Sequence, residues 1–430
     1  MADGSTTAMV LAVVLIAVVV AGIGSFAASA PTVGGSDSGP PPTQTDATTL
    51  DRLHSSGVTG ANVTVGVVDV TGFDATHPAL ASQVVDARSF TPGETVRNGG
   101  NTDHGTAAAS LVTRVAPESR LYLASFDTAS GYRRAVEWLL DRGVDVIVAP
   151  VTFYGKPGDG SARVSRVGTR AVNAGVVFVV PVGNLAQRHW RGRYDPVRNG
   201  THHFGDGTRN YVATDDGDEL RVWLSWDDRH GAEDYTAELY WTNGTASRLV
   251  ARSQPYRSDS VPNERIVASL SEGAYYVVVR GPRNETGARI RLSSPTHRLQ
   301  YHDASRSVTA PATGRDVLAV GAYDDARDGV EPFSGHGPVG ERLGVDVVAP
   351  DGLPAASKPE GFEGSSAAAP YAAGVAALVL DADPDRSPRA VEATLERTAI
   401  DVGNDGPDEA TGYGRVDPVR AIERVRNASG

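Results

Sequence analysis

Four residues stand at the ends of expected strands and helices, in an order that could support acyl-transfer chemistry. Asp69 closes an apolar strand and His104 precedes a helical stretch. Asn184 follows a second apolar run, and Ser366 stands at the start of an Ala-rich helix. A serine hydroxyl is a weak nucleophile that needs a base such as histidine, and an aspartate can hold the imidazole in the required tautomer. An asparagine amide can donate a hydrogen bond to the oxyanion that forms during attack on a carbonyl.

Each of these residues also has an ordinary structural explanation. Ser366 could simply cap its helix, and the Gly–Asn pair ending at Asn184 is typical of a turn. His104 alone could be a packing or surface residue. Asp74 is the alternative to Asp69 as the acid, but it falls beyond the end of the strand, in a turn. The ordered set of four favours the chemical interpretation over these separate ones.

The four residues need a scaffold that brings strand ends together. Short, apolar, β-branched runs alternate with helical stretches, and several of the runs lack polar alternation, as strands buried on both faces do. This pattern predicts an α/β fold with a doubly wound, mostly parallel sheet and helices on both faces. The expected strands cover residues 63–68, 121–126, 144–151, 176–182, 317–320 and 345–348. The expected helices cover residues 106–115, 132–142, 163–173 and 366–381, and a last one begins after Ser387.

The alternation of strands and helices stops near Trp190 and resumes near Ser307. Between these points, residues 220–226 alternate with a period of two, and residues 237–241, 265–270 and 274–280 are rich in β-formers. Short strands at such spacing predict an antiparallel sandwich. We therefore expect an all-β sandwich domain at 190–306, inserted into a catalytic domain formed by 51–189 and 307–426.

The N-terminal region has the composition of a targeting segment followed by a linker. Residues 9–28 carry no charge, and this length can span a bilayer or serve as a signal sequence. The lack of Lys or Arg before this stretch, and Pro31 after the small-residue site, favour a retained anchor over cleavage. We expect a signal sequence or transmembrane anchor at 1–30, a disordered linker at 31–50, and a protein that is secreted or held at the cell surface.

The composition excludes several functions. A net charge of −12 over 430 residues argues against nucleic acid as a partner, and the lack of cysteine excludes disulfides, a thiol nucleophile and Cys-based zinc sites. Lys156 and Lys358 are the two lysines among 40 basic residues. An acidic, Lys-poor surface suits a chain that is soluble in high salt, and codon bias in a GC-rich genome would give the same composition.

Segments around the four residues agree with a known pattern. Residues 364–370 read Gly-Ser-Ser-Ala-Ala-Ala-Pro, residues 104–106 read His-Gly-Thr, and residues 412–417 read Gly-Tyr-Gly-Arg-Val-Asp. Together with Asp69 and Asn184, in this chain order, they resemble the subtilisin-like serine proteases, the subtilase family. The likeness covers about 55–185 and 307–424. The expected insert resembles pre-peptidase C-terminal-like β-sandwich domains.

This resemblance implies a serine endopeptidase that hydrolyses polypeptides through an acyl-enzyme. It assigns Ser366 as nucleophile, His104 as base, Asp69 as the acid and Asn184 to the oxyanion hole. The chain departs from the family in places, including Ser365 for Thr before the nucleophile. A second departure is the run at 148–155, where the family usually has an Asn-x-Ser-x-Gly edge that binds the substrate backbone. The substrate-binding residues therefore stay unassigned.

Two further classes of function are compatible with parts of the sequence. The departures would suit an inactive subtilase-fold protein that binds a partner through its β-domain. An esterase would want a Gly-x-Ser-x-Gly elbow, which Ser366 lacks. No cofactor is required. Acidic turns at 215–219, 227–228 and 401–409 could bind structural Ca²⁺, although their spacing matches no EF-hand loop and solvated turns are the favoured interpretation. The sequence does not indicate an oligomeric state.

Overall fold

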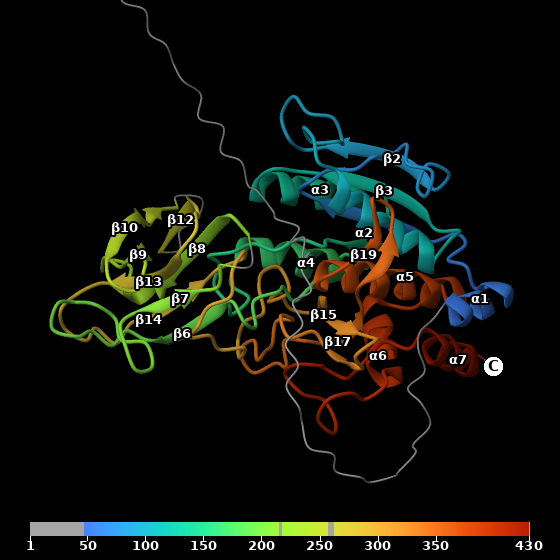
Figure 1. The fold of residues 1–430 in the computed structure, drawn as a ribbon. Coiled ribbons are helices and arrows are strands. Elements are labelled where there is room, and N and C mark those ends of the chain that lie inside the picture. Colours follow the sequence, from blue (N-terminus) through green and yellow to red (C-terminus); the bar gives the residue numbers. More distant parts are fainter. Residues whose placement is uncertain (1–46, 215–216, 257–261, 430) are drawn as a thin grey trace, which may run out of the picture.

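A computed structural model describes residues 47–214, 217–256 and 262–429 (Figure 1). The helices are α1 (Ala47–Ser55), α2 (Asp103–Val115), α3 (Ala129–Asp141), α4 (Arg163–Asn173), α5 (Ser365–Ala382), α6 (Pro388–Thr398) and α7 (Pro418–Ser429), with a short 3₁₀ turn at Asp228–His230. The strands outside the insert are β1 (Thr64–Asp69), β2 (Val84–Ser89), β3 (Arg120–Ser125), β4 (Val146–Val148), β5 (Val177–Pro181), β15 (Leu318–Asp324), β16 (Gly329–Val330), β17 (Val347–Pro350), β18 (Leu353–Ala355) and β19 (Lys358–Phe362). Those of the insert are β6 (His189–Arg193), β7 (Asn210–Val212), β8 (Glu219–Trp226), β9 (Thr236–Thr242), β10 (Ser247–Arg252), β11 (Gln254–Pro255), β12 (Asn263–Ser269), β13 (Ala274–Arg280) and β14 (Arg289–Ser293).

An eight-stranded sheet forms the centre of the larger part of the molecule. Its strands lie in the order β16-β15-β5-β4-β1-β3-β2, with β17 paired to β15. All of these pairs are parallel except β15 with β16. Helices α2 and α5 contribute to the apolar core on one face, and α3 and α4 to that on the other (Figure 1). The predicted doubly wound α/β fold is therefore confirmed.

Helix α5 runs through the core and lies close to α2. It is rich in alanine, and its residues from Ala367 to Leu380 are all buried. A Cβ added to Gly374 would lie 2.5 Å from the Cβ of Val115, so only a glycine allows the two helices to approach this closely. Nearer the helix starts, Ala107 of α2 and Ala367 of α5 share a cluster of buried side chains. Those helix starts are the two ends at which His104 and Ser366 lie.

The insert consists of two antiparallel sheets that face each other across an apolar core. One sheet has the order β10-β9-β13-β7 and the other has the order β11-β12-β8-β14-β6. Leu239 and Val277 of the first sheet and Val222 and Ile290 of the second share one cluster of buried side chains. Figure 1 shows these sheets to one side of the α/β part. The exact boundaries 190–306 stay a prediction.

The expected elements differ from the observed ones in the length of β4, in the presence of β2 and at the N-terminal end of the described chain. The predicted strand at 144–151 is much shorter in the structure, since β4 ends at Val148 and its continuation leaves the sheet. Strand β2 was missed, because it is only half-buried and carries a mixed sequence. The expected signal or anchor segment at 1–30 and most of the linker expected at 31–50 lie outside the described residues. The prediction of disorder is wrong for the last four positions of that linker, because they form the start of α1. Among the described helices, α5 alone has the length and composition of a bilayer span, and it is a buried core helix.

Candidate active site

Asp69 and His104 form a buried pair at the carboxyl edge of the central sheet. Asp69 is the last residue of β1 and His104 is the second residue of α2. His104 Nδ1 lies 2.7 Å from Asp69 Oδ2, and the two residues are 3% and 0% exposed. The other carboxylate oxygen of Asp69 accepts hydrogen bonds from the backbone N–H and the hydroxyl of Thr71. These bonds fix the carboxylate, and the Nδ1 contact leaves His104 Nε2 for a reacting group.

The alternative acid, Asp74, has a different partner. Its carboxylate lies 2.9 Å from Arg97 and accepts hydrogen bonds from Thr76. The Thr76 bonds and the Arg97 charge hold the pKa of Asp74 below its ordinary value. Its backbone N–H donates to Thr106 on α2, so Asp74 supports the helix that carries His104 without contacting the imidazole. The geometry favours Asp69 as the partner of the histidine.

Ser366 lies in the first turn of α5, close to the start of α2. The next residue, Ala367, packs in a small cluster with Ala107 and Leu111 of α2. Phe362, at the end of β19, belongs to the same cluster, and its ring meets the His104 ring edge-on at a centroid distance of 5.1 Å. Ser366 itself is half-buried. It lies at a helix N-terminus, whose dipole favours negative charge.

Asn184 is tied to the residue that precedes Ser366. Its Oδ1 accepts hydrogen bonds from the backbone N–H of Ser365 at 3.1 Å and from the Ser365 hydroxyl at 2.8 Å. The Ser365 hydroxyl also accepts a hydrogen bond from the backbone N–H of Gly183 at 3.1 Å. Because Oδ1 is engaged, the Asn184 amide is oriented and its Nδ2 donor is left for a ligand. The sequence did not reveal the role of Ser365, since these contacts join residues that lie 181 positions apart.

Gly364 and Asp351 shape the turn that leads into α5. Gly364 has φ 102° and ψ 164°, a conformation that is essentially restricted to glycine. A Cβ at this position would lie 2.9 Å from Asn184 Nδ2. The backbone N–H of Gly364 donates to Asp351 Oδ2 at 2.7 Å, and burial raises the pKa of Asp351 to about 7. No role was assigned to Asp351 from the sequence, because its contact with Gly364 depends on the turn that brings the two residues together.

The segment that follows β4 does not lie open at the sheet edge. The backbone N–H of Phe153 donates to Ala310 O at 2.8 Å, which ties this segment to the chain beyond the insert. The Phe153 ring packs against Phe126 and Tyr132, at centroid distances of 6.1 and 5.0 Å. Phe153 is therefore part of the core and its backbone N–H is occupied. This arrangement accompanies the departure of residues 148–155 from the Asn-x-Ser-x-Gly sequence that the family usually has there.

In the acidic turn at 401–409, one of the calcium candidates, two carboxylates cap the local backbone. Asp408 accepts hydrogen bonds from the backbone N–H groups of Ala410 and Thr411, and Asp401 accepts one from Gly406. Residues 215 and 216 lie outside the described residues. A different carboxylate group has ligand-like spacing: the carboxylates of Asp346, Glu392 and Glu396 lie within 4.8 Å of one another. Burial raises the pKa of Asp346 to about 7 and that of Glu392 to about 8, which indicates shared protons near neutral pH.

Sequence comparison connects this arrangement to known proteins. The model of a family described as the subtilase family matches residues 60–218 and 276–414. The chain is 35% identical over 147 residues to subtilisin from Bacillus pumilus, covering 31% of this chain and 51% of that protein. It is 36% identical over 125 residues to the halolysin-like extracellular serine protease Nep from Natrialba magadii, covering 28% of this chain and 22% of that protein. The chain thus spans about half of the first relative's length and less of the second.

Comparison of solved structures gives matches over most of the chain. The CspB protease of Clostridium perfringens superposes with a TM-score of 0.64 and 18% identity, covering 89% of this chain and 97% of that one. A lanthipeptide protease gives a TM-score of 0.51 at 16% identity, covering 88% and 92%. At these identities the likeness establishes the fold alone.

Proposed function

Because this chain belongs to the subtilase family, we propose that it is a serine endopeptidase that hydrolyses polypeptides. In this proposal Ser366 is the nucleophile, His104 the general base, and Asp69 the residue that orients His104. The observation that carries it is the buried 2.7 Å contact between Asp69 and His104, which leaves Nε2 directed away from the carboxylate. A second support is the position of Ser366 beside the His104 helix.

The geometry suggests how each group acts. The Ser366 hydroxyl attacks the carbonyl carbon of the scissile bond while its proton passes to His104 Nε2. The carboxylate of Asp69 stabilises the imidazolium that forms. His104 then gives the proton to the leaving amine, the C–N bond breaks, and an acyl-enzyme remains on Ser366. Water, deprotonated by His104, attacks the ester, and the Ser366 hydroxyl and a free carboxylic acid are released.

Asn184 is the proposed side-chain donor of the oxyanion hole. Its Nδ2 would donate to the oxygen that gains negative charge, together with the backbone N–H of Ser366 at the helix N-terminus. The hydrogen bonds from Ser365 to Asn184 Oδ1 support this assignment, because they orient the amide before substrate binds. Loss of such a donor in subtilisin, which is a relative of this chain, reduces kcat on the order of 10²–10³-fold.

We also propose that the enzyme acts outside the cytoplasmic membrane. This is supported by the uncharged segment at 9–28 and by the similarity to an extracellular serine protease. A retained anchor and a cleaved signal would each place the catalytic domain outside this membrane. Antibody labelling of intact cells tests this proposal, since an internal protein would be labelled only after lysis.

Cleavage of an unfolded, fluorescence-quenched polypeptide in high-salt buffer tests the proposed activity. The wild-type chain should release fluorescence, and Ser366→Ala should lower the rate by at least about 10³-fold with unchanged circular dichroism. The exposed Ser56, at the end of α1, offers a matched control, and Ser56→Ala should cleave like wild type. A folded wild-type chain that cleaves nothing would favour the inactive binding scaffold instead. An active Ser366→Ala variant would refute the assigned nucleophile.

A further inference from the structure

One face of the insert carries a row of arginines on two neighbouring strands. In β14, Ile290 and Leu292 point into the core of the insert, so Arg289 and Arg291 lie on the opposite face. The register pairs Arg289 with Arg193 and Arg291 with Arg191 of β6. Directly opposed residues of an antiparallel pair share one face of the sheet. We call these four residues, Arg191, Arg193, Arg289 and Arg291, the arginine face.

The arginine face has more positive charge than the carboxylates around it balance, since Arg306 adds a fifth cation and Asp159, Asp227 and Asp303 are the three carboxylates that act on Arg191 or Arg291. Like charges that are directly opposed across two strands are destabilising. Within the part of the chain that the structure describes, none of the four guanidinium groups lies within 4.0 Å of a carboxylate. Arg291 donates instead to a carbonyl, that of Arg306, at 2.9 Å. Four arginines without a direct ion pair stand out in a chain whose net charge is −12.

Two arginines of this face, Arg191 and Arg291, are also half-buried, which makes their positive charges more costly. Burial, with the charge of Arg191, lowers the pKa of Arg291 to about 10, although Asp159 opposes this. Burial, with the charges of Arg306 and Arg289, lowers the pKa of Arg191, against Asp227 and Asp303. The local environment therefore disfavours the charged forms in the free protein. A bound anion would reverse that effect, because it would favour both charges.

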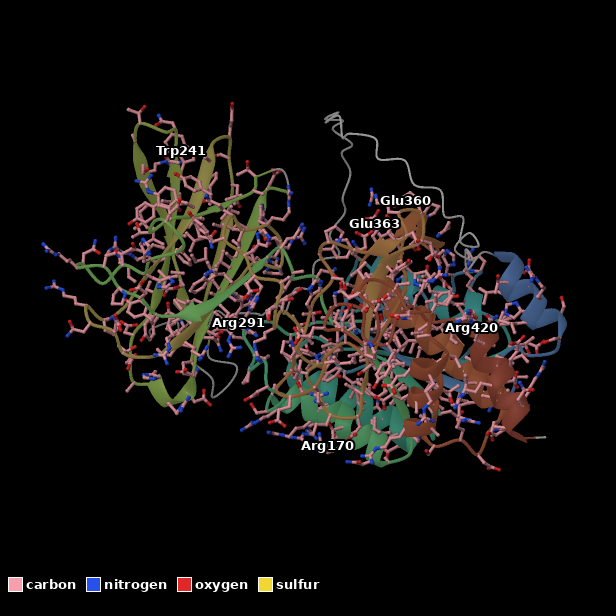
Figure 2. All side chains as sticks on the ribbon, turned by 90° about the horizontal axis from the view of Figure 1, so that it is seen from below. Arg170, Trp241, Arg291, Glu360, Glu363 and Arg420 are labelled. Atoms are coloured by element: carbon pink, nitrogen blue, oxygen red, sulfur yellow. The ribbon has the colours of Figure 1, made fainter. Side chains whose placement is uncertain are left out.

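The arginine face is directed toward the catalytic domain. A Cβ added to Gly158 would lie 2.5 Å from Arg291 Nη2, so the guanidinium touches the segment that continues from the carboxyl end of β4. On the same face of the sheet, Trp223 lies against Gly155. Figure 2 labels Arg291 on the insert, at the side near the catalytic domain. The arginine face therefore lies at the junction between the insert and the segment that follows β4.

Both ends of the insert are fixed close to Asn184. Strand β6 begins at His189, five residues after Asn184. The chain returns at Arg306, three residues before Thr309, whose hydroxyl donates to Val182 O at 3.0 Å. An extended polypeptide spans about 3.4 Å per residue. A substrate bound at Asn184 would thus reach the arginine face within a few residues of the cleaved bond.

We propose that the arginine face binds acidic side chains of the polypeptide substrate, a few residues away from the scissile bond. This inference rests on the proposed endopeptidase function. Planar guanidinium groups donate two parallel hydrogen bonds to a carboxylate, so paired arginines suit Asp or Glu better than they suit neutral residues. Half-buried charge pairs are less screened by salt than exposed ones, so the preference persists in high-salt buffer.

Binding of two matched peptides tests the arginine face without requiring turnover. Fluorescein-labelled peptides with a common centre carry either Glu or Gln at positions three to five residues on both sides of it. The full chain carrying Ser366→Ala should bind the Glu peptide at least about tenfold more tightly. Adding Arg191→Gln and Arg291→Gln should reduce this ratio to within about twofold. Adding Arg163→Gln and Arg170→Gln, two exposed positions on α4 with the same change of charge, should leave the ratio unchanged.

The outcomes separate the arginine face from the proposed function. Equal affinity for the two peptides would overturn the proposed role of the arginine face. An equal loss of the Glu preference in the control variant would do the same. Preferential binding of the Glu peptide with no cleavage by the wild-type chain would uphold the arginine face and contradict the endopeptidase. Cleavage of both peptides with equal kcat/KM would uphold the endopeptidase and contradict the proposed role of the arginine face. If the double variant fails to fold, the exposed Arg193→Gln takes its place, and an unchanged ratio there would again overturn the proposal.

Discussion

Ser365 holds Asn184 through two hydrogen bonds to the same oxygen. The backbone N–H of Ser365 donates to Asn184 Oδ1 at 3.1 Å and the Ser365 hydroxyl donates at 2.8 Å. The pair joins the end of β5 to the start of α5. It therefore couples the proposed oxyanion donor to the helix that carries the proposed nucleophile, and it orients the amide before substrate arrives.

Replacement of Ser365 tests this coupling. Ser365→Ala removes one of the two bonds and leaves the backbone N–H, so we expect kcat to fall about tenfold with little change in KM. Ser365→Thr keeps the hydroxyl and should restore most of the rate. Steady-state kinetics on one quenched peptide provide both parameters. A rise in KM with unchanged kcat would show that Ser365 does not position a transition-state donor.

Gly364 offers a second test of the same region. Gly364→Ala places a methyl group 2.9 Å from Asn184 Nδ2 and strains a glycine-only conformation, so both activity and stability should fall. Gly352→Ala is the matched control, because Gly352 also has positive φ but its Cβ would meet no atom within 4 Å. Urea unfolding should show a loss of about 1–3 kcal/mol for both variants. Only Gly364→Ala should lose more than tenfold in kcat. Equal activity of the two variants would contradict the assigned position of Asn184.

The sequence was sufficient to predict most of the central sheet, and the catalytic roles of the four candidate residues stay a prediction. Buried parallel strands such as β1 have a uniform apolar pattern. Asp69 stands at the end of β1, and His104 at the start of helix α2. The sequence was not sufficient for β6 and β14, because one face of each packs in the insert core while the other carries arginines. The role of Ser365 was missed for a related reason. Its hydrogen bonds to Asn184 depend on tertiary contact, which no local pattern encodes.

Asp351 predicts a specific dependence of stability on pH. Burial, reinforced by Glu331, Glu363 and Asp324, raises its pKa from 3.8 to about 7. The folded protein then holds this proton more tightly than the unfolded chain, so stability falls as the pH rises from about 4 to about 7. Asp351→Asn keeps an acceptor for the Gly364 N–H and removes the titrating carboxyl group, so this dependence of stability on pH is lost. Its unfolding free energy relative to wild type should therefore increase with pH, by roughly 2–4 kcal/mol.

Urea unfolding at several pH values between 4 and 8 measures the effect of Asp351. Asp385→Asn, at an exposed position, serves as the control and should differ from wild type by a constant amount. A difference between Asp351→Asn and wild type that does not change with pH would contradict the raised pKa.

The carboxylates of Asp346, Glu392 and Glu396 predict a similar effect at higher pH. Burial, with the charges of Asp346, Glu396 and Asp316, raises the pKa of Glu392 to about 8. Stability should therefore decline as the pH rises from about 5 to 8, and Glu392→Gln should weaken that decline by about 1–3 kcal/mol because the site is partly exposed. Thermal unfolding of both proteins across this range measures the difference. If Glu392→Gln and wild type lose stability in parallel, the three carboxyl groups do not share protons.

Mapping of a fluorophosphonate adduct tests the central claim most directly, because this reagent reports the nucleophile and its activation together. The wild-type chain in high-salt buffer should gain one adduct, located by peptide mass spectrometry on Ser366. His104→Ala should react more slowly by at least about 10³-fold, and Ser366→Ala should not react. An adduct on another residue, or equal rates for wild type and His104→Ala, would contradict the assignment of Ser366 as a nucleophile activated by His104.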